Sequence, residues 1–86
     1  MASPLNIRER AILDLEGTWW RHDVPKATVI REHLGMSPTR YYELLSLLLA
    51  SEAAYDYDPL TVARARRDRA RRRRIRHEGH QVNPRS

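Results

Sequence analysis

The stretch that decides the fold runs from Ile30 to Leu48 and reads I-R-E-H-L-G-M-S-P-T-R-Y-Y-E-L-L-S-L-L. A helical pattern stops at Gly35, because glycine tolerates the left-handed conformation that commonly ends a helix. A second helix then begins with Ser37 as its N-cap and Pro38 as its first residue. Two helices joined by so short a turn predict a helix-turn-helix, whose second helix can enter the major groove of DNA.

The interface between these two helices can be checked position by position. A helix-turn-helix needs apolar side chains where its helices meet, and with Gly35 in the turn the sequence supplies five. They are Ile30, Leu34, Met36, Tyr41 and Leu44. The position after Ile30 is commonly small but is Arg31 here, so the two helices are expected to cross more openly than usual. A helical hairpin without a nucleic-acid role has the same signals, so the segment favours DNA binding without requiring it.

The composition indicates one small domain. Eighty-six residues form a core that barely outweighs the conformational entropy of ordering it. Without cysteine there is no disulfide or thiolate metal site to supplement that core. The longest apolar run, at residues 47–50, is far shorter than the ~18 residues of a membrane span. The N-terminus also lacks the apolar core of a secretory signal, so we expect a cytoplasmic, nucleoid-associated protein without a membrane partner.

The charge is distributed unevenly along the chain. Residues 1–63 carry six Lys/Arg and nine Asp/Glu, a net charge of −3, whereas residues 64–86 carry ten Arg and two acids, a net charge of +8. Such asymmetry is typical of proteins with a basic arm that binds nucleic acid. We therefore expect most of the affinity for phosphate to come from the C-terminal part.

The first predicted helix begins at Asn6, which forms a capping-box pattern with Glu9. Its apolar stripe is expected at Ile7, Ala11, Ile12, Leu15 and Trp19. Gly17 weakens this helix by about 1 kcal/mol without breaking it. Trp19 and Trp20 resemble a stacking platform for bases, but in so small a domain without Phe we expect both indoles to fill the core.

Two more helices follow, from Pro25 to Leu34 and from Pro38 to about Ala50. The third helix carries two leucines, Leu47 and Leu49, outside its inward stripe. These leucines must meet the C-terminal helix or a second copy of the protein. The sequence leaves both options open, and it therefore predicts a possible homodimer through Leu47, Leu49 and the C-terminal helix.

The C-terminal third predicts a connection followed by a basic helix. Residues 51–57 are interpreted as the connection, with Tyr55 and Tyr57 closing over the core. Asp58 and Pro59 repeat the start signal of the third helix, so a fourth helix is predicted over residues 58–78. Its apolar anchors are expected to be Leu60, Val62 and Ala63. The prediction is an all-α protein: a three-helix domain over residues 1–57 with its helix-turn-helix at about 25–50, the arginine-rich helix, and a disordered tail over 79–86.

The third helix contains the residues predicted to read DNA. Arg40 suits bidentate pairing with guanine O6 and N7, and Glu43, one turn away, could accept from cytosine N4 or hold Arg40 in place. Ser37 and Thr39 at the helix start suit a phosphate, and Tyr42 could contact a phosphate or a base. The alternative is that Arg40 and Glu43 form an ordinary surface pair.

The arginine run is the second signal. Nine arginines occur among residues 64–76 with one aspartate, and we expect them to lack partners within the protein. Arginine suits phosphate and a narrow minor groove. The residues predicted to contact DNA here are Arg64, Arg67, Arg71, Arg72, Arg73, Arg74 and Arg76. An acidic protein could use the same run, but a membrane surface would need a broader apolar face than Ile75 and two alanines provide.

Catalysis and cofactor binding are not expected. The chain has no cysteine nucleophile, no glycine-rich phosphate loop and no Ser–His–acid set that so small a core could hold in a dry cleft. His77 and His80 have a spacing that can bind metal, but no third ligand is evident beside them. We therefore predict no metal site.

Three stretches resemble a known family. They are I-L-D-L-E-x-x-W-W from Ile12, K-x-x-x-I-R-x-x-x-G-M-S-x-T-R-Y-Y from Lys26, and D-P-L-x-V-x-R-x-R-R from Asp58. Over about residues 7–75 the chain resembles a small actinobacterial family of uncharacterised proteins that phages of those bacteria also carry. The resemblance implies a compact helix-turn-helix-like fold and DNA binding, without a known ligand or catalytic residue. Pro38 and Gly17 depart from the family pattern. The helix-turn-helix is also similar to the promoter-reading segment of sigma factors.

These observations predict a DNA-binding protein, a transcriptional regulator whose third helix enters the major groove of double-stranded DNA while the arginine-rich helix contacts phosphates. One alternative is a small phage-type factor that binds a host protein such as RNA polymerase or a nucleoid protein. Another is an architectural DNA binder without sequence preference.

Overall fold

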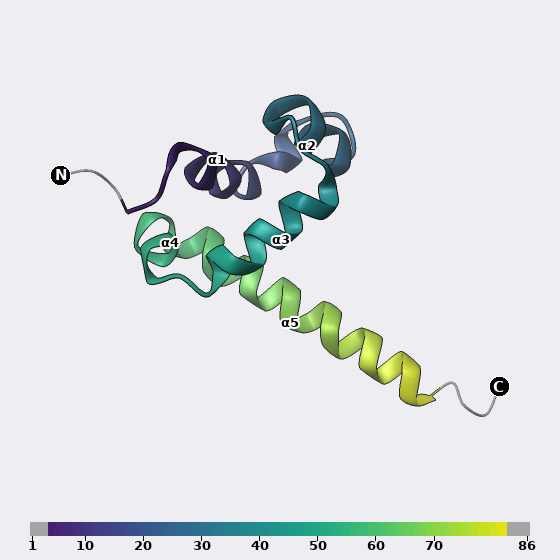
Figure 1. Ribbon diagram of the computed structural model, residues 1–86. Helices are drawn as coiled ribbons and strands as arrows, with labels where there is room; N and C mark the ends of the chain where they lie inside the picture. The colour runs from purple at the N-terminus through teal and green to yellow at the C-terminus, as the bar shows by residue number, and fades with distance from the viewer. Residues whose placement is uncertain (1–3, 83–86) are drawn as a thin grey trace.

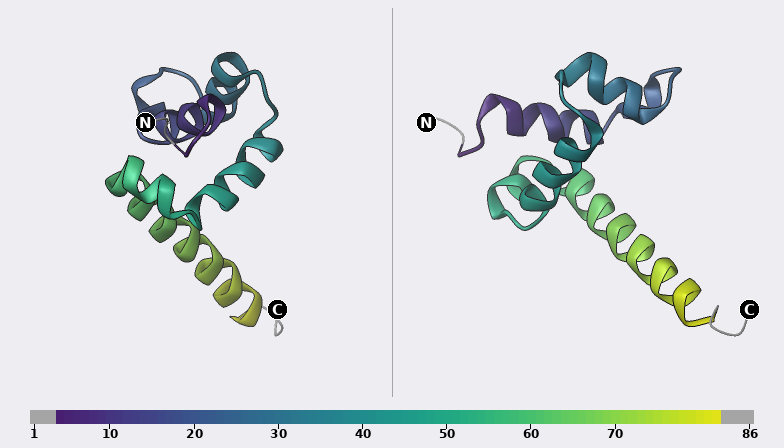
Figure 2. Two further views of the ribbon diagram at one scale, coloured as in Figure 1. Left: turned by 60° about the vertical axis from the view of Figure 1, so that its left-hand side comes forward. Right: turned by 45° about the vertical axis from the view of Figure 1, so that its right-hand side comes forward.

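The computed structural model describes residues 4–82, and side chains as far as Arg74. The fold is all-α, as predicted, and residues 4–82 contain no strand. Its elements, in chain order, are α1 (Ile7–Glu16), the short 3-10 helix η1 (Trp19–Arg21), α2 (Lys26–Leu34), α3 (Pro38–Leu49), α4 (Glu52–Tyr57) and α5 (Pro59–Val82). The first four α-helices and the start of α5 pack together, and the rest of α5 extends away from them (Figure 1). Figure 2 shows the same projection from two further directions.

Local capping interactions set the helix starts. The Asn6 side chain accepts a hydrogen bond from the Glu9 backbone N–H at 2.7 Å, and the Asn6 N–H donates to the Glu9 carboxylate at 2.8 Å. The Ser37 hydroxyl oxygen accepts from the backbone N–H of Arg40 at 3.1 Å. The carboxylate of Asp58 accepts from the N–H of Thr61 at 3.2 Å at the start of α5. The predicted starts at Asn6, Ser37 and Asp58 are therefore confirmed. The helix predicted from Pro25 begins one residue later, at Lys26, with Pro25 as its N-cap.

The turn between α2 and α3 follows the glycine prediction. Gly35 is left-handed, with φ 64°, and no other residue among those described has a positive φ. Ile30 and Tyr41 are fully buried on either side of the turn, and Leu34, Met36 and Leu44 pack partly buried against the core. All five predicted contact positions therefore lie in or beside the core.

The prediction that the first helix continues through the tryptophans is wrong. Helix α1 ends at Glu16 with Gly17 as its C-cap, and the chain turns into η1. Thr18 contributes to this end, because its hydroxyl donates to the Asp14 carbonyl at 2.8 Å. Trp19 packs partly buried against the core as expected, but Trp20 is 48% exposed.

The core lies where α1, α2, α3 and the first turns of α5 meet. Its largest fully buried side chains are Tyr41, Ile12, Leu13, Ile30, Val29 and Val62. Ile7, which was predicted to lie on the inward stripe of the first helix, is 78% exposed. Ile7 faces solvent in the first turn of α1, whereas Leu5 just before the helix is buried.

The two leucines outside the predicted stripe of α3 have different environments. Leu49 is 6% exposed, because α5 covers it, so it contributes to the core of the single chain. Leu47 is 71% exposed. Of the two alternatives that the sequence left open, Leu49 therefore meets the C-terminal helix. A homodimer that uses the exposed Leu47 stays a prediction.

Residues 52–57 form a helix and not the predicted connection. The Ser51 hydroxyl caps α4 by accepting from the Ala54 N–H at 3.3 Å, and Ala54 is fully buried. Tyr55 and Tyr57 do not close over the core, since they are 43% and 41% exposed. The Tyr57 hydroxyl donates to the Asp14 carboxylate at 2.9 Å.

Helix α5 is anchored by residues that differ in part from those predicted. Thr61, Val62 and Ala65 are buried, whereas Leu60 is 82% exposed. The helix continues through Val82, so residues 79–82 of the predicted disordered tail are helical, and residues 83–86 lie outside the described part of the chain. Within residues 4–82, none of the helices has the length and apolar character that crossing a membrane requires.

Candidate nucleic-acid interface

Helix α3 divides into an inward face and an outward face. Tyr41, Leu45, Leu48 and Leu49 are buried, and they lie on one side of the helix at spacings of three and four residues. The opposite side is formed by exposed residues. They are Thr39, Arg40, Glu43 and Leu47. Three of the predicted DNA-reading residues therefore share one solvent-facing surface, which we call the outward face of α3.

Arg40 and Glu43 form a solvated ion pair on this face. The Arg40 Nη1 atom lies 3.3 Å from the Glu43 Oε1 atom, and the two side chains are 58% and 60% exposed. An exposed pair at this spacing contributes about 0.3–0.5 kcal/mol or less. The guanidinium is therefore oriented by Glu43, yet it can leave the pair for a stronger acceptor at little cost.

The start of α3 is exposed but partly occupied by its own cap. Ser37 is exposed, and its hydroxyl oxygen already accepts from the Arg40 N–H. Only its hydroxyl proton is left for a phosphate oxygen. Thr39 is exposed beside it, and no interaction of its hydroxyl is recorded within the described residues.

Tyr42 does not lie on the outward face. Its ring packs edge-on against the Tyr41 ring with centroids 5.1 Å apart, and the Lys26 ammonium lies 5.0 Å from its centroid. Half-buried, it lines a groove between α3 and α5. The structure thus separates Tyr42 from Arg40 and Glu43, with which the sequence grouped it.

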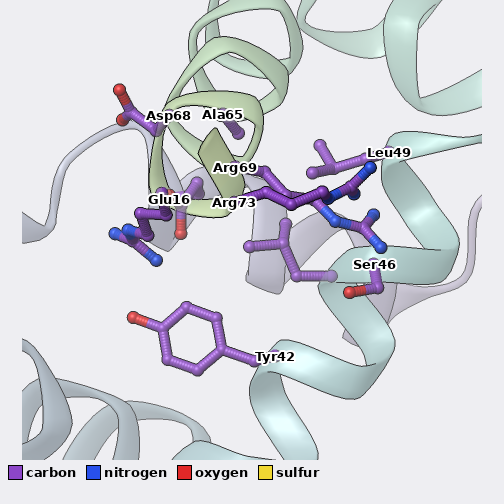
Figure 3. A pocket seen from close by; sticks show the side chains of 10 residues that line it. Glu16, Tyr42, Ser46, Leu49, Ala65, Asp68, Arg69 and Arg73 are labelled. Carbon is purple, nitrogen blue, oxygen red and sulfur yellow. The ribbon is translucent and has the colours of Figure 1, made fainter. Parts of the chain in front are cut away.

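The groove between α3 and α5 has a volume of about 360 Å³ (Figure 3). Its walls are the polar or charged side chains of both helices, and its floor is apolar. The lining residues are Glu16, Tyr42, Leu45, Ser46, Leu49, Ala65, Asp68, Arg69, Arg72 and Arg73. Arg69 was not among the predicted contacts, although its spacing from Ala65 places it on the packed side of the helix.

Some arginines of α5 have partners within the protein, contrary to the prediction. The Arg64 guanidinium lies over the Trp20 ring, 4.5 Å from its centroid. The Arg66 Nε–H donates to the Leu49 carbonyl at 2.8 Å. These two contacts attach the start of α5 to η1 and to the end of α3.

The arginines farther along α5 are exposed. Arg71 pairs with Asp68 at 3.6 Å, whereas Arg67, Arg69 and Arg72–Arg74 have no recorded ion pair or hydrogen bond among the described residues. Of the predicted contacts, Arg76 has a described backbone within α5, but its side chain lies outside the described set.

A nearly buried cation, which the sequence did not indicate, lies behind the groove. The Lys26 Nζ atom is 2.8 Å from the Glu16 Oε1 atom, with side-chain exposures of 13% and 12%. The same carboxylate oxygen accepts from the Tyr41 hydroxyl at 2.6 Å. Burial, together with this carboxylate, raises the pKa of Tyr41 well above its usual range. The network joins α1, α2 and α3 directly beneath the candidate interface.

Metal ligation finds no support among the residues whose side chains are described. No group of three or more His, Asp or Glu side chains is close enough there to hold an ion. His22 and His33 lie with ring centroids 4.5 Å apart at a tilt of 57°, without a third ligand. The side chains of His77 and His80 lie outside the described set.

The geometry can be set beside known proteins. No curated protein and no solved structure gives a significant match to the chain. One family does match, and its description is "protein of unknown function". The match extends from residue 4 to residue 77, so it includes the packed helices, the groove and the whole arginine run of residues 64–76. The chain therefore belongs to the family DUF3263.

Proposed function

We propose that this protein binds double-stranded DNA as a transcriptional regulator, with α2 and α3 acting as a helix-turn-helix. The observation that carries the proposal is the outward face of α3, where a weakly paired Arg40 and Glu43 lie in solvent beside an arginine-rich helix. In such a motif the second helix places its N-terminal side chains against base edges. Arg40 would pair with guanine O6 and N7.

The charge distribution supports the same function. Residues 64–86 carry a net charge of +8, in a chain whose first 63 residues carry −3. The exposed arginines of α5 would neutralise phosphates, which fixes the position of α3 without reading sequence. With about 5–8 such contacts, the log–log slope of affinity against salt should be roughly −4 to −7.

The decisive test replaces Arg40. Arg40→Ala should cost about 1–3 kcal/mol of binding free energy on the preferred duplex and relax the base preference at one position. Arg40→Lys is the matched control, because it keeps the charge but lacks the two-pronged geometry that guanine requires. Fluorescence anisotropy on the preferred duplex and on single-base variants measures both effects.

Two outcomes of this test would contradict base reading. If Arg40→Ala weakens every duplex equally while Arg40→Lys restores binding, Arg40 contacts only the backbone. If the unsubstituted chain shows no attraction to any duplex even in dilute buffer, the proposed function is rejected. A specificity ratio near one in the unsubstituted chain would instead indicate an architectural DNA binder.

A second candidate is a small factor that binds a host protein. Leu47 favours it, because a leucine that is 71% exposed on the outward face of α3 leaves most of its apolar side chain in solvent. The same leucine would serve a homodimer, which a lone helix-turn-helix commonly needs for specificity. Sedimentation of the free protein tests the dimer, and a stoichiometric partner in a pull-down without any duplex affinity would favour the host-protein factor.

The resemblance described above adds one expectation. Relatives of this chain should come from actinobacteria and their phages and should keep the segment G-M-S-x-T-R-Y-Y at residues 35–42. In this chain that segment contains the turn, the cap and Arg40. If most relatives lack an arginine at the position of Arg40, the proposed role of Arg40 in reading bases is contradicted.

A further inference from the structure

The arginines of α5 lie in two rows that point in different directions. Arg69, Arg72 and Arg73 line the groove toward α3. On another side of the helix a second row lines a separate shallow surface, together with Asp68 and Ala70. This outer row consists of Arg67, Arg71 and Arg74.

The groove row continues the buried stripe of α5. Val62 and Ala65 pack into the core at 0% and 6% exposure, and Arg69, Arg72 and Arg73 follow on the same side at spacings of three and four residues. The groove row thus places three guanidiniums along the side of α5 that borders α3. Bringing like charges together there is unfavourable unless an anion lies between them.

The acidic residues of the groove are already engaged elsewhere. Glu16 accepts from both Lys26 and Tyr41 through the same oxygen. Asp68 pairs with Arg71 of the outer row, and its carboxylate points away from Arg69 and Arg73 (Figure 3). The groove row therefore has no recorded counter-charge among the described residues.

The opposite wall of the groove provides hydroxyl groups. Tyr42 and Ser46 lie on α3 between its buried side and its outward face. Figure 3 shows the side chains of Arg69 and Arg73 extending toward Ser46 and Leu49. The Tyr42 hydroxyl points toward the other end of the groove, so the donors that gather at one place are the guanidiniums of Arg69 and Arg73 and the Ser46 hydroxyl (Figure 3). Beside the apolar side chain of Leu49, these donors suit a phosphate attached to a deoxyribose.

We infer that this groove holds a backbone phosphodiester of the DNA strand that flanks α3, clamped between Arg69 and Arg73 of the groove row and the hydroxyl of Ser46. This inference rests on the proposed function. It specifies which arginines of α5 bind the DNA backbone. Because the groove borders the outward face of α3, one strand passes along it while α3 faces the bases. The outer row makes looser phosphate contacts outside the groove.

The test compares two variants of equal charge in the full chain. The groove variant, Arg69→Gln with Arg73→Gln, removes two cations from the groove row. The outer variant, Arg67→Gln with Arg74→Gln, removes two cations from the outer row. Among the described residues, none of these four arginines has an ion pair or a hydrogen bond. The groove variant should lose at least about tenfold more affinity for a duplex than the outer variant at 0.15 M salt. Its salt slope should fall by about two, as expected when two phosphate contacts are lost.

A single neutral linkage locates the phosphate. Methylphosphonates are placed at one position of the duplex at a time. At one position the substitution should lower the affinity of the unsubstituted protein, but it should not lower the affinity of the groove variant any further. Ser46→Ala should also weaken binding, and the methylphosphonate at that same position should have a smaller effect on this variant. Equal helix content and melting temperature of the two arginine variants, by circular dichroism, exclude a folding effect.

Each remaining outcome has a distinct meaning. Equal losses for the two variants, in a protein that still binds duplex, overturn the clamp and leave DNA binding in place. Saturable binding of inorganic phosphate in the groove without duplex binding would mean a small phosphate ligand, and would overturn both proposals. No binding of duplex by the unsubstituted chain rejects the proposed function itself.

Discussion

Lys26 shows how one residue can join three helices. Its ammonium lies 5.4 Å, 5.6 Å and 5.0 Å from the ring centroids of Trp19, Tyr41 and Tyr42, and it forms an ion pair with Glu16. Aromatic faces and a carboxylate both favour a cation. Together they hold a nearly buried charge that would otherwise be unfavourable.

Replacing this cation should therefore destabilise the fold. Lys26→Met keeps much of the side-chain volume but leaves the carboxylate of Glu16 buried without its cation, at an expected cost of about 2–4 kcal/mol. Adding Glu16→Gln to this variant should restore part of the loss, since a neutral amide can still accept from the Tyr41 hydroxyl. Urea unfolding followed by circular dichroism measures both. A double variant no more stable than Lys26→Met would contradict the role of the ion pair.

Tyr41 should make the fold sensitive to alkali. Burial, then the charge of Glu16 and the hydrogen bond to it, raise the pKa of Tyr41 above its ordinary value of 10.0. Above that pH the unfolded chain loses the proton while the folded chain keeps it, so stability is full below about pH 10 and falls as the pH rises, by up to about 1.4 kcal/mol per unit for this group.

The matching control is Tyr41→Phe. This variant should be less stable near pH 8, because it loses the hydroxyl contact with Glu16, but it should lose less stability between pH 9.5 and pH 11. Urea unfolding at four pH values gives, for each protein, the slope of the free energy of unfolding against pH. Parallel slopes for the two proteins would show that Tyr41 titrates freely in the folded state.

At the scale of helices, Gly17 allows α1 and α5 to approach closely. Its φ of −84° is open to any residue, so propensity alone would favour alanine here. A Cβ at this position, however, would lie 2.8 Å from the Thr61 hydroxyl oxygen. Thr61 is buried and β-branched, and it has little freedom to move.

Gly17→Ala is therefore expected to destabilise the protein by about 1–3 kcal/mol through overpacking. Adding Thr61→Ala removes the clashing oxygen and should recover part of the loss. Thermal unfolding by circular dichroism compares the three proteins. A more stable Gly17→Ala variant would show that the helices can separate without cost.

Local signals predicted the helix starts well and some helix ends poorly. Asn6, Ser37 and Asp58 cap helices by bonding to residues three positions away, so a short window contains the whole interaction. Gly17 and Ser51 were misinterpreted, because the end of α1 depends on its approach to α5 and because α4 is too short to show a period. A six-residue helix is stabilised by packing and not by its own sequence.

At the scale of the whole molecule, α5 combines an anchored start with a charged extension. Four adjacent arginines, Arg71–Arg74, repel one another on a helix that extends away from the body. Sulfate or duplex DNA should relieve this repulsion and raise helix content, measured as ellipticity at 222 nm. Replacing these four arginines with glutamine should make the helix content independent of sulfate. Unchanged ellipticity in the unsubstituted protein would mean that repulsion does not limit the helix.

The candidate site was predictable only in part. Thr39, Arg40 and Glu43 were identified correctly as neighbours on one exposed face, because a helical period places them there. The position of Arg69 in the groove and the contact of Arg64 with the Trp20 ring were not predicted, since they depend on where α3 and Trp20 lie relative to α5.

The sequence by itself determined the all-α class, the turn at Gly35, the capped helix starts and the separation of charge between the two parts of the chain. Each of these depends on residues that are neighbours along the chain, or on composition. Only the tertiary structure decided that Leu49 is covered by α5, that Lys26 lies among three rings, and that the arginines divide into two rows. These contacts join residues far apart in the chain, and they depend on helix packing, which local patterns do not encode.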